Sequence, residues 1–350
     1  MVINFSINMS EFRLKGKDAW PQAFHFLMAF LISLTWNYGF SQPISVSILD
    51  EGLFKKTEVI SSKKIAFIDL SELQSGPHIA VVDLKGQILS RFPIPRLRFD
   101  SEWINWGPGI TFDKTRQTIW YLAPKVGLTE FDLTGNITQT INFSKASHQI
   151  QRTGSGGFVL PYSWDEKKDN QLIELDASGA VMFSWSAEQY LNDNPTSLSI
   201  APTQPNSFTA TTSAVKTNKG NFFLSLSQRN LILKINSTGD VVWSQTVSIR
   251  PHTLVVDGDE LIGYSARNPN RVVLKNKSCN CFKEIVLEEK LTGKTRTRTL
   301  SLQYLGSDIW FTSGVDRLYL ITDQGKVIWQ LSHEGLKGRP TGFHSAVIFD

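Results

Sequence analysis

Short segments in which apolar and polar residues alternate recur along the chain and predict β-strands. In one recurring unit a strand ends in Asp or Asn, a glycine follows three residues later, and a second strand begins directly after it. An Asx side chain bonds to the backbone of the turn that it starts, and glycine accepts a positive φ, so the unit predicts a β-hairpin. It occurs at Asp83/Gly86, Asp132/Gly135, Asp176/Gly179, Asn236/Gly239 and, with threonine first, Thr322/Gly325.

The spacing of these hairpins predicts a repeat. Successive turn glycines lie 49, 44, 60 and 86 residues apart, and the last interval, about twice 43, predicts a degenerate sixth copy at 271–287. A further short β run precedes each hairpin (KIAFIDL, TIWYLA, GFVLPYS, NFFLSLS, ELIGYS, DIWFTS), and before most of these stands another, such as HQIQ or HTLVV. Four strands in about 43 residues, repeated six times, are typical of an all-β, six-bladed β-propeller.

The two ends of the predicted ring complement each other. The first full hairpin, near residue 65, has no inner strand of its own, whereas the chain finishes in a strand at 344–350 (HSAVIFD). We therefore expect the C-terminal strand to supply the inner strand of the first blade and to close the ring. The propeller is predicted to occupy residues 42–350. Trp185, Trp243 and Trp329 fall in outer strands, where we expect them to pack between blades.

Residues 1–41 are predicted to be a signal peptide or a membrane anchor. Basic residues between 13 and 17 precede an apolar run at 23–36, which is shorter than the roughly 20 residues of a comfortable membrane span. Small residues near the end of the segment suit cleavage before Gln42. A cleaved signal and a retained tether over 19–38 both remain open, and either places the propeller in the periplasm or otherwise outside the cytoplasm.

Composition and charge narrow the class of protein. The chain is 41% hydrophobic and 19% charged, which excludes a disordered polypeptide. Its net charge of +4 is spread without a basic block, so we expect no nucleic-acid partner. The two cysteines, Cys279 and Cys281, have no histidine nearby, and we expect neither a metal nor a cofactor. A disulfide between them could be structural or redox-active.

Histidines recur at one repeat-equivalent position. The innermost strand of each blade lines the axis of a propeller, so equivalent positions in successive blades converge. Counting back ten residues from the start of each second strand gives His148, Thr212 and His252 in the third, fourth and fifth blades. By topology, His344 has the same place in the closing strand. These residues are predicted to line the central funnel.

This funnel suits an anionic ligand. Neutral imidazole can attack an electrophile, and imidazolium can protonate a leaving group. Arg229 and Asn230 end the second strand of the fourth blade and are expected to reach the same funnel, where a guanidinium fits the oxygens of a tetrahedral anion. Histidines that merely bond to the backbone in a narrow channel are the structural alternative.

Three units resemble those of the arylsulfate sulfotransferases, which are bacterial periplasmic six-bladed propellers: HQIQRTGSGGFVL, GNFFLSLSQRNLILKINSTGDVVW and PHTLVVDGDELIGYSARNPNRVV. The resemblance covers roughly 145–345. It implies transfer of a sulfuryl group from an aryl sulfate to a phenol through a sulfated histidine, without a nucleotide donor. By motif position His252 is the nucleophile, His148 assists the leaving phenolate, and Arg229 grips the sulfuryl oxygens.

The remaining site residues, His344, Thr212 and Asn230, are expected to contact the substrate. Two positions depart from the family's pattern: Thr212 stands where the family has a histidine, and Thr253 follows the nucleophile where an aspartate is typical. Loss of one funnel cation weakens charge stabilisation in the transition state by about 3 kcal/mol. An enzyme is favoured on the resemblance. The alternative is a non-catalytic extracytoplasmic propeller that binds an anionic ligand or scaffolds a protein partner.

Overall fold

The computed structural model describes residues 44–56, 62–69, 76–94, 107–124, 126–143, 145–162, 169–194, 208–266, 271–276, 279–287, 301–314, 317–333, 343 and 345–350. The chain divides into the units 1–42 and 43–350. The predicted signal or anchor segment and His344 lie outside the described residues. Within the part of the chain that is described, no helix is both long and apolar enough to cross a membrane.

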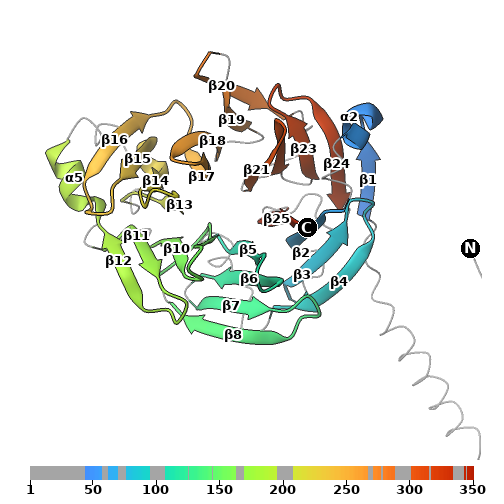
Figure 1. Cartoon of the computed structure of the whole chain (residues 1–350), viewed down its shortest axis with the longest axis horizontal. Coiled ribbons are helices and arrows are strands. Elements are labelled where there is room, and N and C mark those ends of the chain that lie inside the picture. The colour runs from blue at the N-terminus through green and yellow to red at the C-terminus, as the bar shows by residue number, and fades with distance from the viewer. Residues whose placement is uncertain are drawn as a thin grey trace, which may run out of the picture. The chain divides into compact units, whose positions relative to one another are not determined.

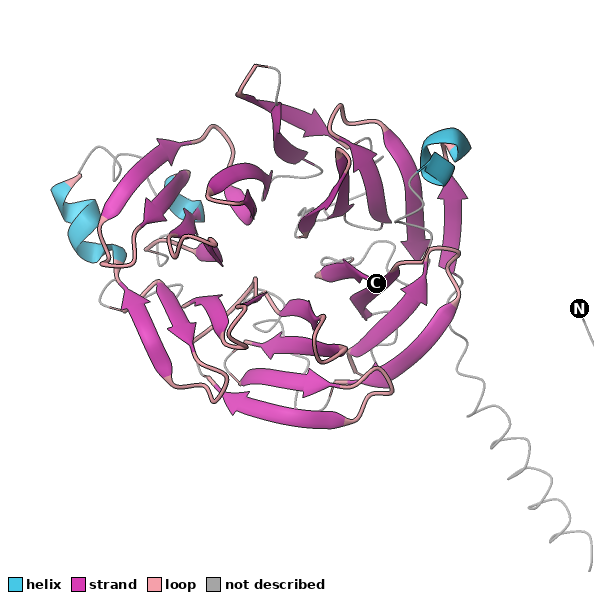
Figure 2. Ribbon diagram, viewed as in Figure 1, coloured by secondary structure: helices cyan, strands magenta, loops and turns pink. Residues whose placement is uncertain are grey.

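Six antiparallel sheets surround a central axis, as blades of a propeller (Figure 1, Figure 2). The predicted all-β, six-bladed β-propeller is therefore confirmed, and the degenerate copy at 271–287 forms two strands of the fifth blade. From the inner to the outer edge the strands are: in blade 1, β25 (Ala346–Phe349), β2 (Lys64–Asp69), β3 (His78–Asp83) and β4 (Ile88–Pro93); in blade 2, β5 (Gly109–Asp113), β6 (Thr118–Ala123), β7 (Gly127–Phe131) and β8 (Ile137–Asn142); in blade 3, β9 (Gln151–Arg152), β10 (Phe158–Pro161), β11 (Leu172–Leu175) and β12 (Val181–Trp185).

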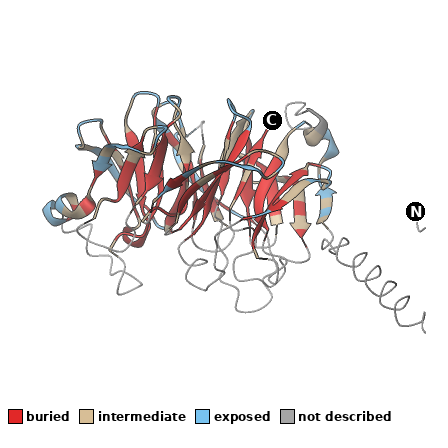
Figure 3. Ribbon diagram, turned by 90° about the horizontal axis from the view of Figure 1, so that it is seen from below, coloured by how far each residue is buried: buried red, intermediate tan, exposed pale blue. Residues whose placement is uncertain are grey.

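Blades 4 to 6 follow the same order, with one additional strand. They contain β13 (Thr211–Lys216), β14 (Phe222–Leu226), β15 (Leu231–Ile235) and β16 (Val241–Thr246) in blade 4; β17 (Pro251–Asp257), β18 (Glu260–Ala266), β19 (Arg271–Asn276) and β20 (Cys281–Val286) in blade 5; β21 (Leu302–Gly306), β22 (Ile309–Ser313), β23 (Arg317–Thr322), β24 (Val327–His333) and β1 (Ile44–Ile48) in blade 6. Among the described residues, three short helices lie between strands: α2 (Glu51–Lys56), α5 (Ala187–Asp193) and η3 (Ser227–Arg229). Burial is concentrated in the strands (Figure 3).

Strands from both ends of the described chain join blades that lie far away in sequence. β25 pairs with β2, which places Phe349 opposite Lys64. β1 pairs with β24 as a fifth strand of blade 6, with Val46 opposite Leu331. β1 is not predictable from the sequence, because a five-residue alternating segment outside the repeat carries no sign of its partner.

The turn glycines pack against the preceding blade. Gly135 has φ +95°, and a Cβ atom there would lie 2.5 Å from the Cβ of Phe92 on β4. The positive φ and this close approach both require glycine. The same contact recurs around the ring, between turn glycine and outer strand, at Gly86 with Val46, Gly179 with Ile141, and Gly325 with Ile285. The repeated glycine is therefore required both by the turn and by the contact between neighbouring blades, which is called the seam.

Tryptophans reinforce two of these seams. The indole nitrogens of Trp185 and Trp329 each donate a 2.9 Å hydrogen bond to the turn of the following blade, to the carbonyls of Gly239 and Leu84. Both tryptophans are buried, as expected. The same expectation for Trp243 is wrong: its side chain is 38% exposed and its ring packs edge-on against Phe223 of its own blade.

The seam that Trp243 borders differs in its chemistry. The outer hairpin of blade 5 has no turn glycine, and Cys279 and Cys281 form a disulfide in it. Blade 4 packs on blade 5 through an apolar cluster that includes Phe223 and Tyr264. Charge adds to this contact, because the carboxylate of Asp259 accepts hydrogen bonds from Lys234 Nζ (2.7 Å) and Asn221 Nδ2 (3.0 Å). Burial alone would raise the pKa of Asp259, but the bonds from Lys234, Asn221 and Thr217 outweigh it and lower this pKa to about 2.

We expect Gly135→Ala to destabilise the ring more than the matched variant Gly220→Ala does. Gly220 has φ +83°, but a Cβ atom added there would have no atom within 4 Å, so its substitution measures backbone strain alone, about 1 kcal/mol. Gly135→Ala adds overpacking against Phe92, a further ~1–3 kcal/mol. Urea denaturation followed by circular dichroism measures both changes. Equal losses of stability would contradict the packing role.

A second prediction concerns pH. Asp259→Asn should lower the denaturation midpoint at pH 7, where the carboxylate is ionised and bonded to Lys234. The folded pKa of about 2 lies below the usual 3.8, so this contribution is complete above about pH 4 and fades as the pH falls towards 2. The difference between wild type and variant should therefore shrink over that range. A difference that is constant from pH 5 to pH 2.5 would refute the ionic seam.

Candidate functional site

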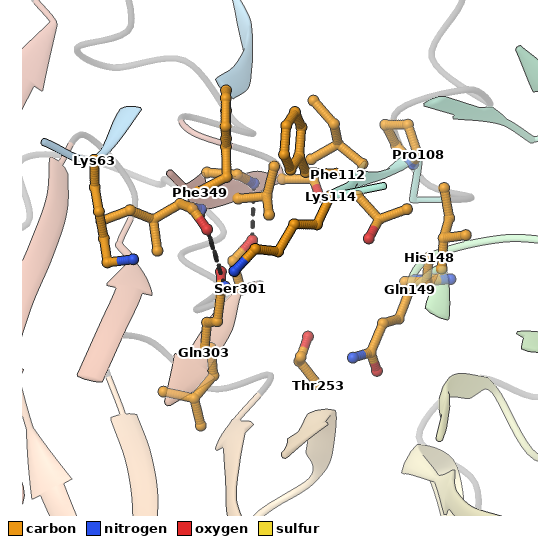
Figure 4. Close-up of a pocket in the computed structure, with 18 of the residues that line it drawn as sticks. Lys63, Pro108, Phe112, Lys114, His148, Gln149, Thr253, Ser301, Gln303 and Phe349 are labelled. Carbon is orange, nitrogen blue, oxygen red and sulfur yellow. Dashed lines mark hydrogen bonds between the residues drawn. The ribbon is translucent and has the colours of Figure 1, made fainter. Parts of the chain in front are cut away.

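A cavity of about 360 Å³ lies on the propeller axis (Figure 4). Its walls come from β5, β17, β21 and β25 with residues adjoining these strands, from the segment 148–150 before β9, and from Lys63. Apolar side chains line the middle, among them Ile110, Ile150 and Ile348. A cavity of this size, with an apolar wall and a few polar groups, is of the kind that holds small ligands.

The cavity has two chemically different ends, which are called the histidine mouth and the lysine mouth. β5 lies between Pro108, which is beside His148, and Lys114, and β25 lies between Ser345 and Asp350. The histidine mouth is formed by His148, His252, Thr253, Ser301 and Ser345, where the inner strands begin. The lysine mouth is formed by Lys63, Lys114 and Asp350, where they end.

The three repeat-equivalent positions lie side by side at the histidine mouth. The imidazole rings of His148 and His252 are 5.1 Å apart between centroids, at 62°, and both residues are 4% exposed. Thr212 lies between their backbones: its Oγ1 donates to the carbonyl of His252 (2.9 Å), and its own carbonyl accepts from Gln149 N (3.4 Å). Thr212 is buried and does not line the cavity.

Two β-bulges and one positive φ angle set the orientation of the side chains of His148, Thr212 and His252. The pairing of β13 with β14 shifts register between Thr211 and Ser213, so that Thr212 lies in a bulge, and β17 shifts between Pro251 and Leu254, around His252. His148 has φ +66°. A bulge redirects a side chain from the regular pleat, and non-glycine residues with positive φ are often found at functional sites.

A Gly-Pro-Gly segment at 107–109 seats His148. The carbonyl of Gly107 accepts a hydrogen bond from His148 N (2.5 Å). A Cβ atom at Gly107, whose φ is +69°, would lie 2.5 Å from the His148 ring, and one at Gly109 would overlap the His148 carbonyl oxygen. The role of residues 107–109 at the site was not predicted from the sequence. Two glycines that flank a proline just before a strand were nevertheless a sign that another part of the backbone approaches closely.

Each histidine has a hydroxyl group beside Nδ1. The Nδ1 atom of His148 is 2.9 Å from Ser147 Oγ, and that of His252 is 3.4 Å from Thr253 Oγ1. A hydroxyl that accepts a hydrogen bond from Nδ1–H leaves the ring's lone pair on Nε2, which is the form required of a nucleophile or a base. Thr253 offers His252 a neutral hydroxyl, which stabilises an imidazolium less than a carboxylate does.

The structure does not bring Arg229 and Asn230 to the cavity. Arg229 Nε donates to the carbonyl of Phe208 (2.9 Å), and the guanidinium lies 5.6 Å from the centre of the Phe208 ring. Burial lowers the pKa of Arg229. Asn230 adopts a left-handed conformation (φ 48°) and caps η3. Neither residue is among the described residues that line the cavity.

Polar side chains near the axis also hold the inner strands together. Gln303 on β21 uses its amide to pair with both backbone groups of Ile348 on β25 (2.9 and 3.2 Å). Gln151 pairs in the same way with Lys216 of blade 4. The Oγ of Ser301 accepts a hydrogen bond from Ala346 N (2.9 Å). These contacts give the polar wall of the cavity a structural role in addition to any ligand contact.

Comparison with known proteins places the chain by fold. No family model matches it, and no curated protein matches it in sequence. A crystal structure of a protein of unknown function from Bacteroides caccae is 13% identical, with a TM-score of 0.57, over 82% of this chain and 98% of that one. At this identity the likeness shows the fold alone.

Two further solved structures have lower structural similarity. A catalytically inactive virginiamycin B lyase from Staphylococcus aureus with quinupristin is 13% identical (TM-score 0.43; 83% of this chain, 99% of that chain). The β-propeller domain of Cps50 (Swd1) from Myceliophteria thermophila is 10% identical (TM-score 0.45; 83% and 89%). The strand topology and the lining of the cavity define the class of the protein: a six-bladed β-propeller with an axial cavity.

We expect Gly107→Ala to displace the His148 ring. The added methyl group would lie 2.5 Å from the imidazole, whereas Gly258→Ala, at a similar φ of +60°, has no atom within 4 Å and serves as the control. Histidine-selective NMR, with the His148 resonances assigned from His148→Ala, measures the displacement. The ring resonances of His148 should shift in Gly107→Ala alone. Equal shifts in both variants would show that Gly107 does not seat the ring.

Proposed function

We propose that the protein transfers a sulfuryl group from an aryl sulfate to a phenol through a sulfated His252, as a divergent relative of the arylsulfate sulfotransferases. The observation that supports this most is the pairing of His148 and His252, 5.1 Å apart, at one mouth of the axial cavity. Two imidazoles at this separation can divide the work of nucleophile and general acid.

The proposed first step breaks one bond and forms another. His252 Nε2 attacks sulfur, the bond from sulfur to the aryl oxygen breaks, and its electron pair leaves with the phenolate. The imidazolium of His148 gives its proton to that oxygen and becomes neutral. Such transfers proceed through loose, in-line transition states by analogy with phosphoryl transfer, so positioning and charge stabilisation do most of the work.

The second step returns the site to its starting state. An acceptor phenol gives its proton to His148, its oxygen attacks sulfur, and the bond between sulfur and His252 breaks. The covalent intermediate implies ping-pong kinetics. Thr253 and Ser301, which line the same mouth, offer hydroxyl donors to the sulfuryl oxygens. Arg229, the anion-binding residue that the resemblance implies, would need to leave its contact with the Phe208 carbonyl to take part.

We also propose that residues 1–41 direct the propeller out of the cytoplasm, as a cleaved signal or as a tether over 19–38. The support is the order of a basic flank and a short apolar run in the sequence. A disulfide between Cys279 and Cys281 fits an oxidising compartment.

A specific observation favours the second candidate function, a propeller that binds an anionic ligand without reaction. Thr212 supplies a hydroxyl where the family has a histidine, and that hydroxyl is already engaged with the His252 carbonyl. Together with the position of Arg229, this leaves the histidine mouth with fewer cations than the resemblance implies. Binding without turnover separates this function from the first.

The test is release of nitrophenolate from 4-nitrophenyl sulfate in the presence of phenol. We expect acceptor-dependent release by the wild type, and a loss of at least ~10³-fold in His252→Ala, because the nucleophile is removed. His148→Ala should lose about 10²-fold, and a more acidic leaving phenol should restore part of this loss.

His78→Ala is the matched control, since His78 is a buried histidine of blade 1 that does not line the cavity. It should retain the wild-type rate. Saturable binding of 4-nitrophenyl sulfate without any release, by folded wild-type protein, would favour the binding propeller. Release that persists in His252→Ala would overturn the assignment of the nucleophile.

A further inference from the structure

The lysine mouth of the cavity contains a cluster of three charged side chains that take no part in the proposed reaction. Lys63 Nζ lies 2.6 Å from Asp350 Oδ1, and Lys114 Nζ lies 3.1 Å from Asp350 Oδ2. One side-chain carboxylate therefore bridges two ammonium groups, and these three side chains together have a net charge of +1. The side chain of Lys114 is 79% exposed and that of Asp350 is 52% exposed, whereas that of Lys63 is 11% exposed.

The arrangement is a carboxylate-binding site with its own carboxylate in place. Hydrogen bonds from Lys63 and Lys114 lower the pKa of Asp350, so this carboxyl group is ionised at neutral pH. Because Asp350 and Lys114 are half exposed or more, their ion pair is weak and exchanges readily with other ions. An anion that arrived through the cavity could take the place of the Asp350 side chain between the two lysines.

Aromatic rings adjoin this cluster. Phe112 precedes Lys114 on the same strand end, and Phe349 precedes Asp350; their rings are stacked 4.0 Å apart between centroids, at 18°. Both residues line the cavity. The wall next to the lysines is therefore apolar and aromatic, and it suits the flat body of an aryl ligand.

We propose that the lysine mouth is a second subsite, which binds an anionic substituent at the far end of an elongated aromatic ligand seated in the axial cavity. Lys63 and Lys114 would hold a carboxylate there, displacing Asp350, while the other end of the ligand faces His148 and His252. The proposal shares the axial cavity with the proposed function but involves no transfer step.

The length of the cavity sets the length of the ligand. The lining of blade 1 extends from Ser345 to Asp350, five steps of about 3.3 Å along an extended strand. Side chains reach inward from both mouths. A rod of two aromatic rings with one anionic group at each end therefore suits both mouths, whereas a ligand with a single anionic group uses only one.

The experiment compares two probes by isothermal titration calorimetry: 4′-sulfobiphenyl-4-carboxylate and biphenyl-4-sulfonate. A sulfonate cannot transfer its sulfuryl group, so the measurement is independent of catalysis, and failure of the transfer reaction would be seen only in the nitrophenolate assay. We expect the carboxylate-bearing probe to bind about tenfold more tightly to the wild type, as a charge-assisted contact implies.

Three variants and one control decide the assignment. Lys114→Met and Lys63→Met should bring the ratio of the two affinities close to one and leave biphenyl-4-sulfonate binding nearly unchanged. Asp350→Asn should increase the ratio, because the competing carboxylate is removed. Lys275→Met, at an exposed pair with Glu260 outside the cavity, should match the wild type.

If Lys63→Met fails to fold, Lys114→Met still tests the proposal, because the Lys114 side chain is exposed. An affinity ratio that is the same in wild type, Lys114→Met and Asp350→Asn would overturn the proposal. So would a carboxylate that weakens binding to the wild type, or the absence of measurable binding of both probes.

Discussion

The seam between neighbouring blades is the contact on which the rest of this structure depends. Each sheet has an apolar face that it cannot bury alone, and it buries it against the next sheet around the ring. At four of these seams the turn of one blade lies against the outer strand of the preceding blade, and a glycine in that turn leaves the space. Gly135 against Phe92 shows how little room there is. At blade 1 the preceding surface includes Val46 of β1, so the ring closes through strands from both ends of the described chain.

The axis is shaped by a related constraint. Inner strands of neighbouring blades belong to different sheets and have no backbone ladder between them. Hydroxyl and amide side chains replace that ladder, as Gln303 does for Ile348 and Ser301 for Ala346. The fold therefore requires polar side chains between the inner strands. Few further groups would be needed to make an anion-binding site there. Bulges in β13 and β17 and the positive φ of His148 then turn particular side chains towards one mouth.

The ring departs from its own repeat between blades 4 and 5. The glycine turn is replaced there by a disulfide-bridged hairpin, Trp243 is partly exposed, and the Lys234–Asp259 pair joins the blades. The cavity shows a comparable asymmetry. Histidines from blades 3 and 5 form one mouth, whereas residues next to β2, β5 and β25 form the other. A ligand in this cavity meets imidazoles at one end, aromatic and aliphatic walls in the middle, and ammonium groups at the far end.

Features that repeat could be predicted from the sequence, and features that do not repeat could not. The six-bladed fold and the convergence of His148, Thr212 and His252 were readable, because residues at one repeat position occupy one place around an axis. The place of β1, the exposure of Trp243 and the position of Arg229 were decided by single contacts without a repeat signature. The lysine mouth is the clearest example, since Lys63 and Asp350 meet across 287 residues of chain. Periodicity alone determined the scaffold and the axial histidine positions, whereas packing between distant segments decided which side chains reach the cavity.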